Sequence, residues 1–164
     1  MGARDSTRTE AGLPLYGHEL AGEHDINHIE AGYGAFVKLH KPFFVGRSAM
    51  VLAATNRRRE IVRFQMKEKG IRAVRGGFPV VSARGEYAGV VTSCTLVEGV
   101  QTGLALVQSA YAQEGTPLAI FPMPREGKAP AEKSKSELGP GDRVLLADQA
   151  VVVSRFPLRQ PSVG

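Results

Sequence analysis

The sequence has one cysteine, no tryptophan and no long apolar run. With Cys94 as its only thiol, the chain cannot form an internal disulfide, which favours a reducing, cytoplasmic location. No apolar stretch approaches the roughly 20 residues that a helix needs to cross a bilayer, and the N-terminus lacks the basic-then-apolar pattern of a secretory signal. We therefore expect no membrane segment. Cys94 lies in an apolar, strand-like run, which indicates a small buried hydrophobe rather than a nucleophile.

Several chemical motifs are also missing. There is no Gly-rich phosphate loop and no dinucleotide fingerprint, and Gly46-Arg47-Ser48 lacks the second glycine of a nucleophile elbow. His24 and His28 have the spacing of a helical zinc pair. However, Asn27 has the form of a helix cap, which would leave His24 outside the helix. The residues alone therefore assign neither a metal site nor a catalytic group.

The length, composition and net charge are those of a basic chain that can fold. Its 164 residues suffice for one domain, or for one small domain plus a piece of another, and 43% hydrophobic content predicts a packed core. The net charge of +5 favours an anionic partner. Basic residues gather at 57–59 and 67–75, but only Phe64 and Phe78 lie nearby to stack on bases. This scarcity argues against single-stranded nucleic acid.

The N-terminal third alternates short elements with glycine and proline. Residues 1–26 are typical of a strand or short helix followed by a punctuated connection. Asn27 and Glu30 have the spacing of a capping box, which predicts a helix start. Residues 35–39 alternate as in a short strand, and residues 46–54 favour a helix by composition.

From residue 60 the pattern changes to period two, with Val62, Phe64 and Met66 on one face. Further strands are expected at 78–82, 87–96, 103–107, 117–122, 143–146 and 150–155. Short strands with polar turns predict a small antiparallel β-barrel, which closes its own edges. The fold class is thus α+β to mainly β, dividing near residue 56. Residues 124–142, rich in Pro, Lys, Glu and Ser, are predicted to form a mobile loop.

The stretch from 2 to 17 is the most distinctive. Arg4 and Arg8 are one helical turn apart, so on a helix their guanidinium groups would share a face. Two such groups suit a carboxylate or phosphate, because each offers parallel donors to two oxygens. Alternatively, Asp5, Arg8 and Glu10 form only local ion pairs on a solvated turn, each worth a few tenths of a kcal/mol.

This opening stretch resembles the signature of the glycine cleavage system T-protein family, the aminomethyltransferases. The residues that carry the resemblance are Gly2-Ala3-Arg4-Asp5, Arg8, 10–13, 15–17, 29–32, 37–39, 44–47, 89–93 and 104–107. The resemblance spans nearly the whole chain but only the C-terminal part of the family's length. It implies that residues 1–55 are the C-terminal piece of the folate-binding domain and that residues 56–164 are the C-terminal β-barrel. The loop at 124–142 is longer than the resemblance leads us to expect.

The resemblance also implies an activity. T-proteins bind tetrahydrofolate and transfer to it a one-carbon unit from an aminomethyl group on the lipoyl arm of the H-protein, releasing ammonia. By resemblance, Arg4 matches the family arginine that contacts the bound substrate or folate, and Arg159 matches a C-terminal basic residue that closes the folate site. Alternatively, Arg159 is a charged residue of a frayed chain end and has no part in a site. The family's catalytic aspartate precedes the Gly-Ala-Arg-Asp motif, and here Met1 stands directly before it. We therefore expect a missing N-terminal half or partner chain to supply it.

Three hypotheses follow. The first is the C-terminal portion of a tetrahydrofolate-dependent aminomethyltransferase, which alone would bind folate weakly or not at all. The second is a related folate-dependent demethylase or methyltransferase, which residues 94–97 and the long loop favour. The third is a non-enzymatic barrel that binds an anionic partner such as RNA through residues 57–59 and the neighbouring lysines.

Overall fold

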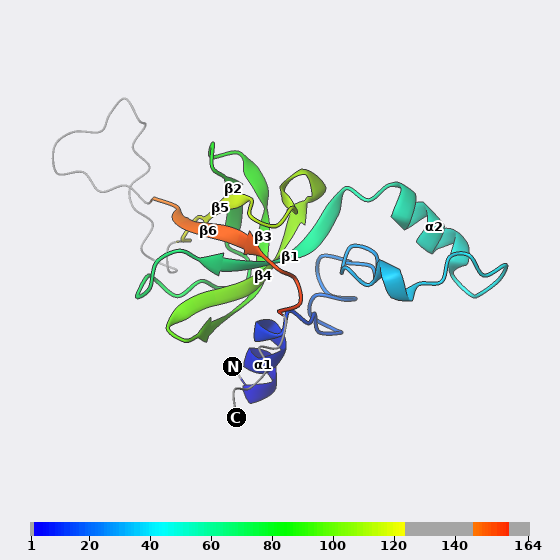
Figure 1. Cartoon of the computed structure of the whole chain (residues 1–164), viewed down its shortest axis with the longest axis horizontal. Helices are drawn as coiled ribbons and strands as arrows, with labels where there is room; N and C mark the ends of the chain where they lie inside the picture. Colours follow the sequence, from blue (N-terminus) through cyan, green and yellow to red (C-terminus); the bar gives the residue numbers. More distant parts are fainter. Residues whose placement is uncertain (1, 124–145, 158–164) are drawn as a thin grey trace.

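A closed barrel of six antiparallel strands forms the centre of the protein (Figure 1). A computed structural model describes residues 2–123 and 146–157. The strands are β1 (Arg59–Met66), β2 (Pro79–Ser82), β3 (Tyr87–Val97), β4 (Val100–Gln108), β5 (Pro117–Ile120) and β6 (Asp148–Val153). They are paired in the order β1-β4-β3-β2-β5-β6, and β6 pairs with β1 to close the barrel. The predicted antiparallel barrel is confirmed.

The strands predicted for the barrel agree with the observed ones to within a few residues at their ends, with one exception. The strand expected over 143–146 falls almost wholly outside the described residues, as does the loop expected over 124–142. The turn between β3 and β4 lies where Glu98 and Gly99 predict it, and both residues have positive φ, +50° and +82°. Two successive positive φ values match the right-handed twist of a tight hairpin.

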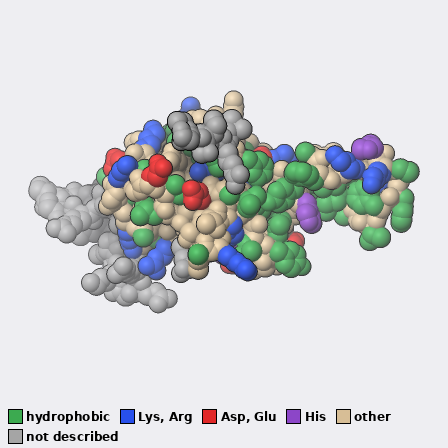
Figure 2. Space-filling view, turned by 60° about the horizontal axis from the view of Figure 1, so that its bottom comes forward, with side chains coloured by type: hydrophobic (Ala, Val, Ile, Leu, Met, Phe, Trp, Pro, Cys, Tyr) green, Lys and Arg blue, Asp and Glu red, His purple; other side chains and the backbone are tan. Residues whose placement is uncertain are grey.

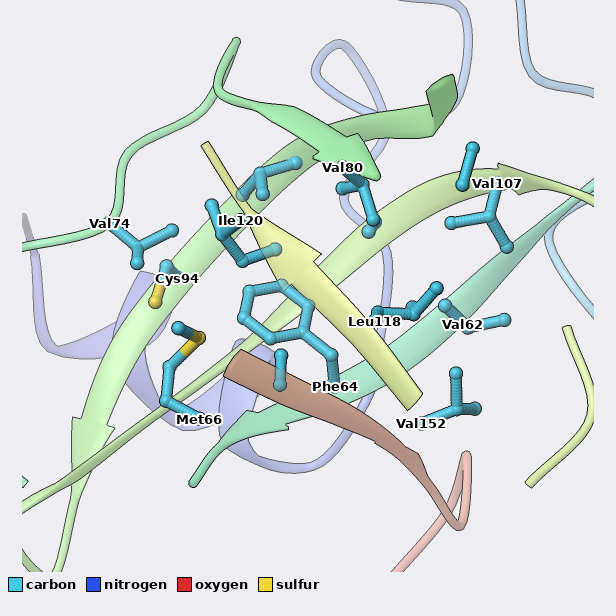
Figure 3. Packing of buried hydrophobic residues seen from close by; sticks show 14 residues of the cluster. Val62, Phe64, Met66, Val74, Val80, Cys94, Val107, Leu118, Ile120 and Val152 are labelled. Carbon is cyan, nitrogen blue, oxygen red and sulfur yellow. The ribbon is translucent and has the colours of Figure 1, made fainter. Parts of the chain in front are cut away.

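The barrel interior holds the main hydrophobic core (Figure 3). The alternation predicted for β1 is confirmed, because Val62, Phe64 and Met66 all point inward and are buried. They are joined by Val74, Val80, Ala88, Val91, Cys94, Ala105, Val107, Leu118, Ile120, Ala150 and Val152. Phe64 is fully buried, and the close-up places its ring in the middle of the cluster.

A second hydrophobic cluster lies on the outer face of β1 and β4. It joins Ile26 and Ala31 of the N-terminal segment to Ile61, Leu104 and Leu106 of the two strands. Helix α1 (Ala3–Glu10) packs on β3 and β4. Because β1 and β4 are covered on both faces, β4 is buried over Thr102–Val107 without the alternation of a half-exposed strand.

After the N-terminal segment that packs on β1 and β4, the chain projects away from the barrel (Figure 1). The projecting part contains a short 3₁₀ helix, η1 (Gly34–Phe36), and helix α2 (Arg47–Thr55), and neither has a buried residue. A second 3₁₀ helix, η2 (Ser109–Tyr111), follows β4. The helix predicted over 46–54 is confirmed. In the described part of the chain, no helix has the length and apolar content needed to traverse a membrane.

Two local predictions are wrong. The capping bonds of Asn27 and Glu30 do form, with the backbone N–H of Glu30 3.0 Å from Asn27 Oδ1 and that of Asn27 3.1 Å from Glu30 Oε2. They close a turn rather than start a helix, because Gly32 reverses the backbone at φ +81°. The strand predicted over 35–39 is also wrong. There the chain projects beyond the barrel, no neighbouring strand pairs with it in the described structure, and η1 forms instead.

We predict that Gly89→Ala destabilises the barrel. A Cβ at Gly89 would lie 2.0 Å from the carbonyl oxygen of Leu106 and 2.7 Å from the Cα of Val107. Both are backbone atoms of the paired strand, so relief requires the strands to separate, and overpacking of this kind costs about 1–3 kcal/mol. Guanidinium chloride unfolding followed by circular dichroism measures the change. Gly2→Ala is the control, since its Cβ would meet no atom within 4 Å. Equal stabilities of the two variants would contradict the prediction.

Candidate functional site

Helix α1 presents its two arginines differently. Arg4 lies exposed in the first turn, and none of the ion pairs among the described residues includes it. Arg8 lies one turn later and is largely buried. Its Nε donates to Asp5 Oδ1 at 2.8 Å, and its Nη1 donates to Glu19 Oε2 at 2.9 Å. The pair with Asp5 is local, as the second interpretation has it, but that interpretation is wrong about a solvated turn, because Arg8 is largely buried and also pairs with the buried Glu19. Arg4, in contrast, is exposed.

Glu19 is a fully buried carboxylate at the base of this helix. Besides Arg8, its oxygens accept hydrogen bonds from the backbone N–H of Leu15 at 2.9 Å and the hydroxyl of Ser93 at 2.8 Å. Burial raises the pKa of Glu19, but the Leu15 N–H, the Ser93 hydroxyl and the Arg8 guanidinium together lower it below its ordinary value. Glu19 is therefore charged at neutral pH and ties α1, the following loop and β3 together.

Sequence reasoning missed Glu19. Its neighbours, Gly17, His18 and Leu20, are those of an ordinary surface loop. What makes it special is Ser93, 74 residues further along the chain. His18 lies over the same place, with its Nε2 3.0 Å from the carbonyl oxygen of Thr92 and 3.8 Å from Glu19 Oε1.

A second cation, the partly buried Arg155, lies just after β6. The Nη2 of Arg155 donates to the carbonyl oxygen of Ala31 at 3.2 Å, and its guanidinium lies 5.4 Å from the centroid of the Phe156 ring. Its Nε and Nη1 are buried and have no hydrogen-bond partner in the described structure. Burial lowers the pKa of Arg155 to about 10, so it remains protonated at neutral pH. Sequence analysis selected Arg159 instead, which lies outside the described residues.

The arginine run at 57–59 is partly neutralised. Arg57 forms an ion pair with Glu60, and Arg59 forms one with Glu30 at 2.6 Å. Arg59 also donates to the carbonyl oxygen of His24 at 2.9 Å. Two of the three arginines invoked for RNA binding are therefore paired with glutamates, which weakens that hypothesis, and Arg59 also holds the N-terminal segment against β1.

A cavity of about 950 Å³ opens beside the β3–β4 hairpin. Its lining includes Cys94, Gln101 and Ser6, the last from α1. Gln101 holds one wall in place, since its Oε1 accepts from the backbone N–H of Val74 at 2.6 Å and its Nε2 donates to the carbonyl oxygen of Arg72 at 2.9 Å. Burial raises the pKa of the Cys94 thiol to about 12. Cys94 is 3% exposed, which confirms the buried hydrophobe that its sequence context predicts.

His24 and His28, whose spacing is that of a helical zinc pair, do not lie on a helix. Within residues 2–123 and 146–157, no three His, Cys, Asp or Glu side chains gather closely enough to hold a metal ion. His24 and His28 lie on separate parts of a turn-rich segment, which does not provide the helical geometry that their spacing requires.

We predict that Glu19→Gln lowers the free energy of unfolding by about 2–4 kcal/mol at pH 7, because it removes one member of a buried ion pair. The folded-state pKa of Glu19 lies below its ordinary value. Its charge therefore stabilises the fold above the unfolded-state pKa of roughly 4.3, and this contribution is lost as the pH falls through the lower folded-state pKa. Denaturant unfolding at pH 7 and at pH 3 should show the difference between wild type and variant shrinking at the acid end. Glu23→Gln, at an exposed glutamate of the same loop, is the control. A Glu19→Gln deficit that is absent at pH 7, or unchanged at pH 3, would contradict this account.

Comparison with known proteins finds relatives that are named aminomethyltransferases. The aminomethyltransferase of Alkaliphilus oremlandii (strain OhILAs) is 45% identical over 125 residues, which cover 73% of this chain and 32% of that protein. The aminomethyltransferase of Caldanaerobacter subterraneus subsp. tengcongensis is 44% identical over 126 residues, covering 74% of this chain and 32% of that protein. The chain thus spans about a third of the length of these relatives. No family model matches the sequence.

A solved structure agrees on the fold. The glycine cleavage system aminomethyltransferase T from Bartonella henselae superposes with a TM-score of 0.67 at 24% sequence identity, covering 93% of this chain and 37% of that one. The sequence matches fall in the C-terminal part of the relatives. This chain is therefore homologous to the C-terminal portion of the aminomethyltransferases.

Proposed function

We propose that this chain supplies the C-terminal portion of a tetrahydrofolate-dependent aminomethyltransferase. On this proposal residues 1–55 complete a folate-binding domain and residues 56–164 form the C-terminal barrel. The observation that carries the proposal is how α1 is held in place. The buried Arg8–Glu19 ion pair fixes the helix, and Arg4 on the same helix remains exposed to solvent. Identity of 38–45% to named aminomethyltransferases supports the same assignment.

The exposed Arg4 fits one part of the cofactor. Tetrahydrofolate ends in glutamate carboxylates, and a guanidinium can donate two parallel hydrogen bonds to a carboxylate. Arg8 cannot take this role, since Asp5 and Glu19 already occupy it. We assign Arg4 to the folate carboxylates, and Arg159 to the same site as its C-terminal basic residue. Tetrahydrofolate, when bound, supplies the nitrogen that accepts the one-carbon unit.

The rest of the site belongs to other residues. Near Arg4 in the sequence, Asp5 pairs with Arg8 and Glu10 is exposed. We assign neither carboxylate to catalysis. On this proposal, the two thirds of the relatives' length without a counterpart here provide the catalytic carboxylate and most of the pterin contacts. The lipoylated H-protein would deliver the aminomethyl group. This chain's own contributions are binding, through Arg4, and orientation, through the buried Glu19 network beneath α1.

We predict that the isolated chain binds tetrahydrofolate weakly or not at all, and that the chain co-expressed with the N-terminal portion of the Alkaliphilus oremlandii relative binds it. In that complex Arg4→Ala should weaken binding by about 1.5–3 kcal/mol, or roughly tenfold to 150-fold, the loss of a charge-assisted hydrogen bond. Isothermal titration calorimetry measures both effects.

Arg58→Ala is the matched control, since this exposed arginine belongs to none of the ion pairs of the described residues. Submicromolar affinity of the isolated chain would overturn the division of the site between two portions. Equal losses for Arg4→Ala and Arg58→Ala would remove Arg4 from the folate site.

A further inference from the structure

The segment between β1 and β2 forms one wall of the cavity beside the β3–β4 hairpin. Residues 67–78 have no helix or strand, and Val74 is the one fully buried residue among them. On this side the cavity is lined by Gly70, Ile71, Ala73, Val74 and Arg75. A segment without a hydrogen-bonded ladder of its own needs other partners for its shielded backbone groups. The contacts that hold this wall therefore decide the shape of the cavity.

One side chain supplies these contacts. The Oε1 of Gln101, in β4, accepts a hydrogen bond from the backbone N–H of Val74 at 2.6 Å. Its Nε2 donates to the carbonyl oxygens of Ile71 at 3.3 Å and of Arg72 at 2.9 Å. In the described part of the chain, no other hydrogen bond reaches the backbone of residues 68–74. The carboxamide thus does for the wall what a neighbouring strand does elsewhere in the barrel.

The amide of Gln101 has no hydrogen-bonding capacity left for anything else. A carboxamide nitrogen donates two hydrogen bonds and its oxygen accepts two. Both donations go to the wall, and Oε1 also accepts from the Cys94 thiol at 3.9 Å. Gln101 therefore cannot hydrogen-bond to a molecule in the cavity without releasing the wall. Its effect on such a molecule is exerted through the residues that it holds in place.

The wall ends on a cation. Arg75 directly follows Val74, lines the cavity and is exposed, and none of the ion pairs among the described residues includes it. Lys69 lies at the rim, with its Nζ 3.9 Å from the place of a Cβ on the lining residue Gly99. The described residues contribute no aspartate or glutamate to the lining. The cavity therefore favours a ligand that carries a negative group.

The rest of the lining is mainly apolar. It includes the side chains of Ile71, Val74, Cys94 and Leu96, with the hydroxyls of Ser6 and Thr95 among them. The volume of about 950 Å³ falls within the range of small-molecule sites, which is about 300–1,000 Å³. Apolar walls of this extent bury an apolar body, and the guanidinium of Arg75 can donate to an anionic end.

The cavity lies on a different side of α1 from Arg4. Ser6 of α1 lines the cavity, and Arg4 precedes it by two residues. Two residues correspond to about 200° around a helix, so the two side chains leave α1 in nearly opposite directions. The cavity is therefore separate from the place that the proposed function assigns to the folate carboxylates.

We propose that this cavity is a second ligand site, that it takes a small molecule with an apolar body and an anionic end, and that Gln101 is its positioning residue. Gln101 fixes the wall from Ile71 to Val74, and the wall in turn places Arg75 beside the anionic end of the ligand. This inference goes beyond the proposed function and does not depend on it.

The test of the ligand class uses the full chain and two probes that share an apolar ring system. Anilinonaphthalene sulfonate carries an anionic group, and phenylnaphthylamine lacks it. Amide NMR spectra recorded during each titration give the dissociation constant and the place of binding. We expect both probes to shift the amides of residues 71–75 and 94–101. Arg75→Gln should weaken the sulfonate about fivefold or more, through loss of a charge-assisted hydrogen bond, and should leave phenylnaphthylamine unchanged.

Arg84→Gln is the matched control for the charge. Arg84 is an exposed arginine in the turn between β2 and β3 and, like Arg75, belongs to none of the ion pairs of the described residues. Its replacement should leave both dissociation constants as they are in the wild type. Equal losses of sulfonate affinity for the two variants would overturn the role of Arg75 and with it the ligand class.

The role of Gln101 has its own variants. Gln101→Met keeps the length of the side chain but removes its bonds to the wall, so hydrogen exchange at the Val74 amide should become about tenfold faster and both probes should bind more weakly. Gln101→Glu keeps the acceptor for the Val74 N–H, so the protection of that amide should be largely restored. Gln108→Met is the control, since Gln108 ends β4 and its Nε2 donates to the carbonyl oxygen of Tyr87 at 3.1 Å.

A merely structural role of Gln101 would lower the global stability without this local pattern. Unchanged Val74 exchange and unchanged probe affinity in Gln101→Met would overturn its assignment as the positioning residue. If Gln101→Met does not fold, the comparison is made with Gln101→Glu and phenylnaphthylamine, which has no charge to be repelled. Loss of the donations to Ile71 and Arg72 should then weaken this neutral probe, and an unchanged affinity would overturn the assignment.

The place of binding provides the remaining outcomes. Hydrophobic side chains gather on the projecting part of the chain (Figure 2), where Phe43 and Val45 are 81% and 94% exposed. Amide shifts confined to residues 34–56 would show adsorption to that surface and would overturn the cavity site. Displacement of the sulfonate from the cavity by tetrahydrofolate would assign the cavity to folate, which overturns the second site and leaves the proposed function standing.

Discussion

A carboxylate removed from water beneath helix α1 determines how the N-terminal part of this protein is placed. Burying a charge costs several kcal/mol unless it is paired and hydrogen-bonded, and Glu19 is fully buried. Its partners come from α1 (Arg8), from the loop (Leu15) and from β3 (Ser93). The cost is offset only when all three elements are in place, so one side chain couples their positions. The exposed face of α1, and with it Arg4, is oriented as a consequence.

The barrel and its cover are joined in the same way by apolar contacts. Ile26 and Ala31 pack against Ile61, Leu104 and Leu106, so residues on both sides of position 56 share one hydrophobic cluster. The ion pair between Glu30 and Arg59 lies at the same junction. The N-terminal segment therefore covers a sheet face that would otherwise be exposed, and it is as much a part of the folded unit as the strands beneath it.

The barrel could be predicted from sequence because the patterns that indicate its strands and turns involve neighbouring residues. Alternation in β1 and the positive-φ turn at Glu98-Gly99 depend on neighbouring residues alone. The burial of Glu19 could not, since it depends on a serine 74 residues away. The capping pattern at Asn27 was misleading for a related reason, because the same two hydrogen bonds can close a turn or open a helix. The residues that follow decide between them, and here Gly32 ends the turn.

The barrel and the projecting residues 34–56 differ in what they contribute to stability. The barrel has its own closed sheet and its own core, so its stability does not depend on covering the projecting part. The projecting part, in contrast, buries no residue of α2 and contributes little to that core. We therefore expect substitutions at exposed side chains such as Phe43 and Val45 to lower the stability less than substitutions at Gly89 and Glu19.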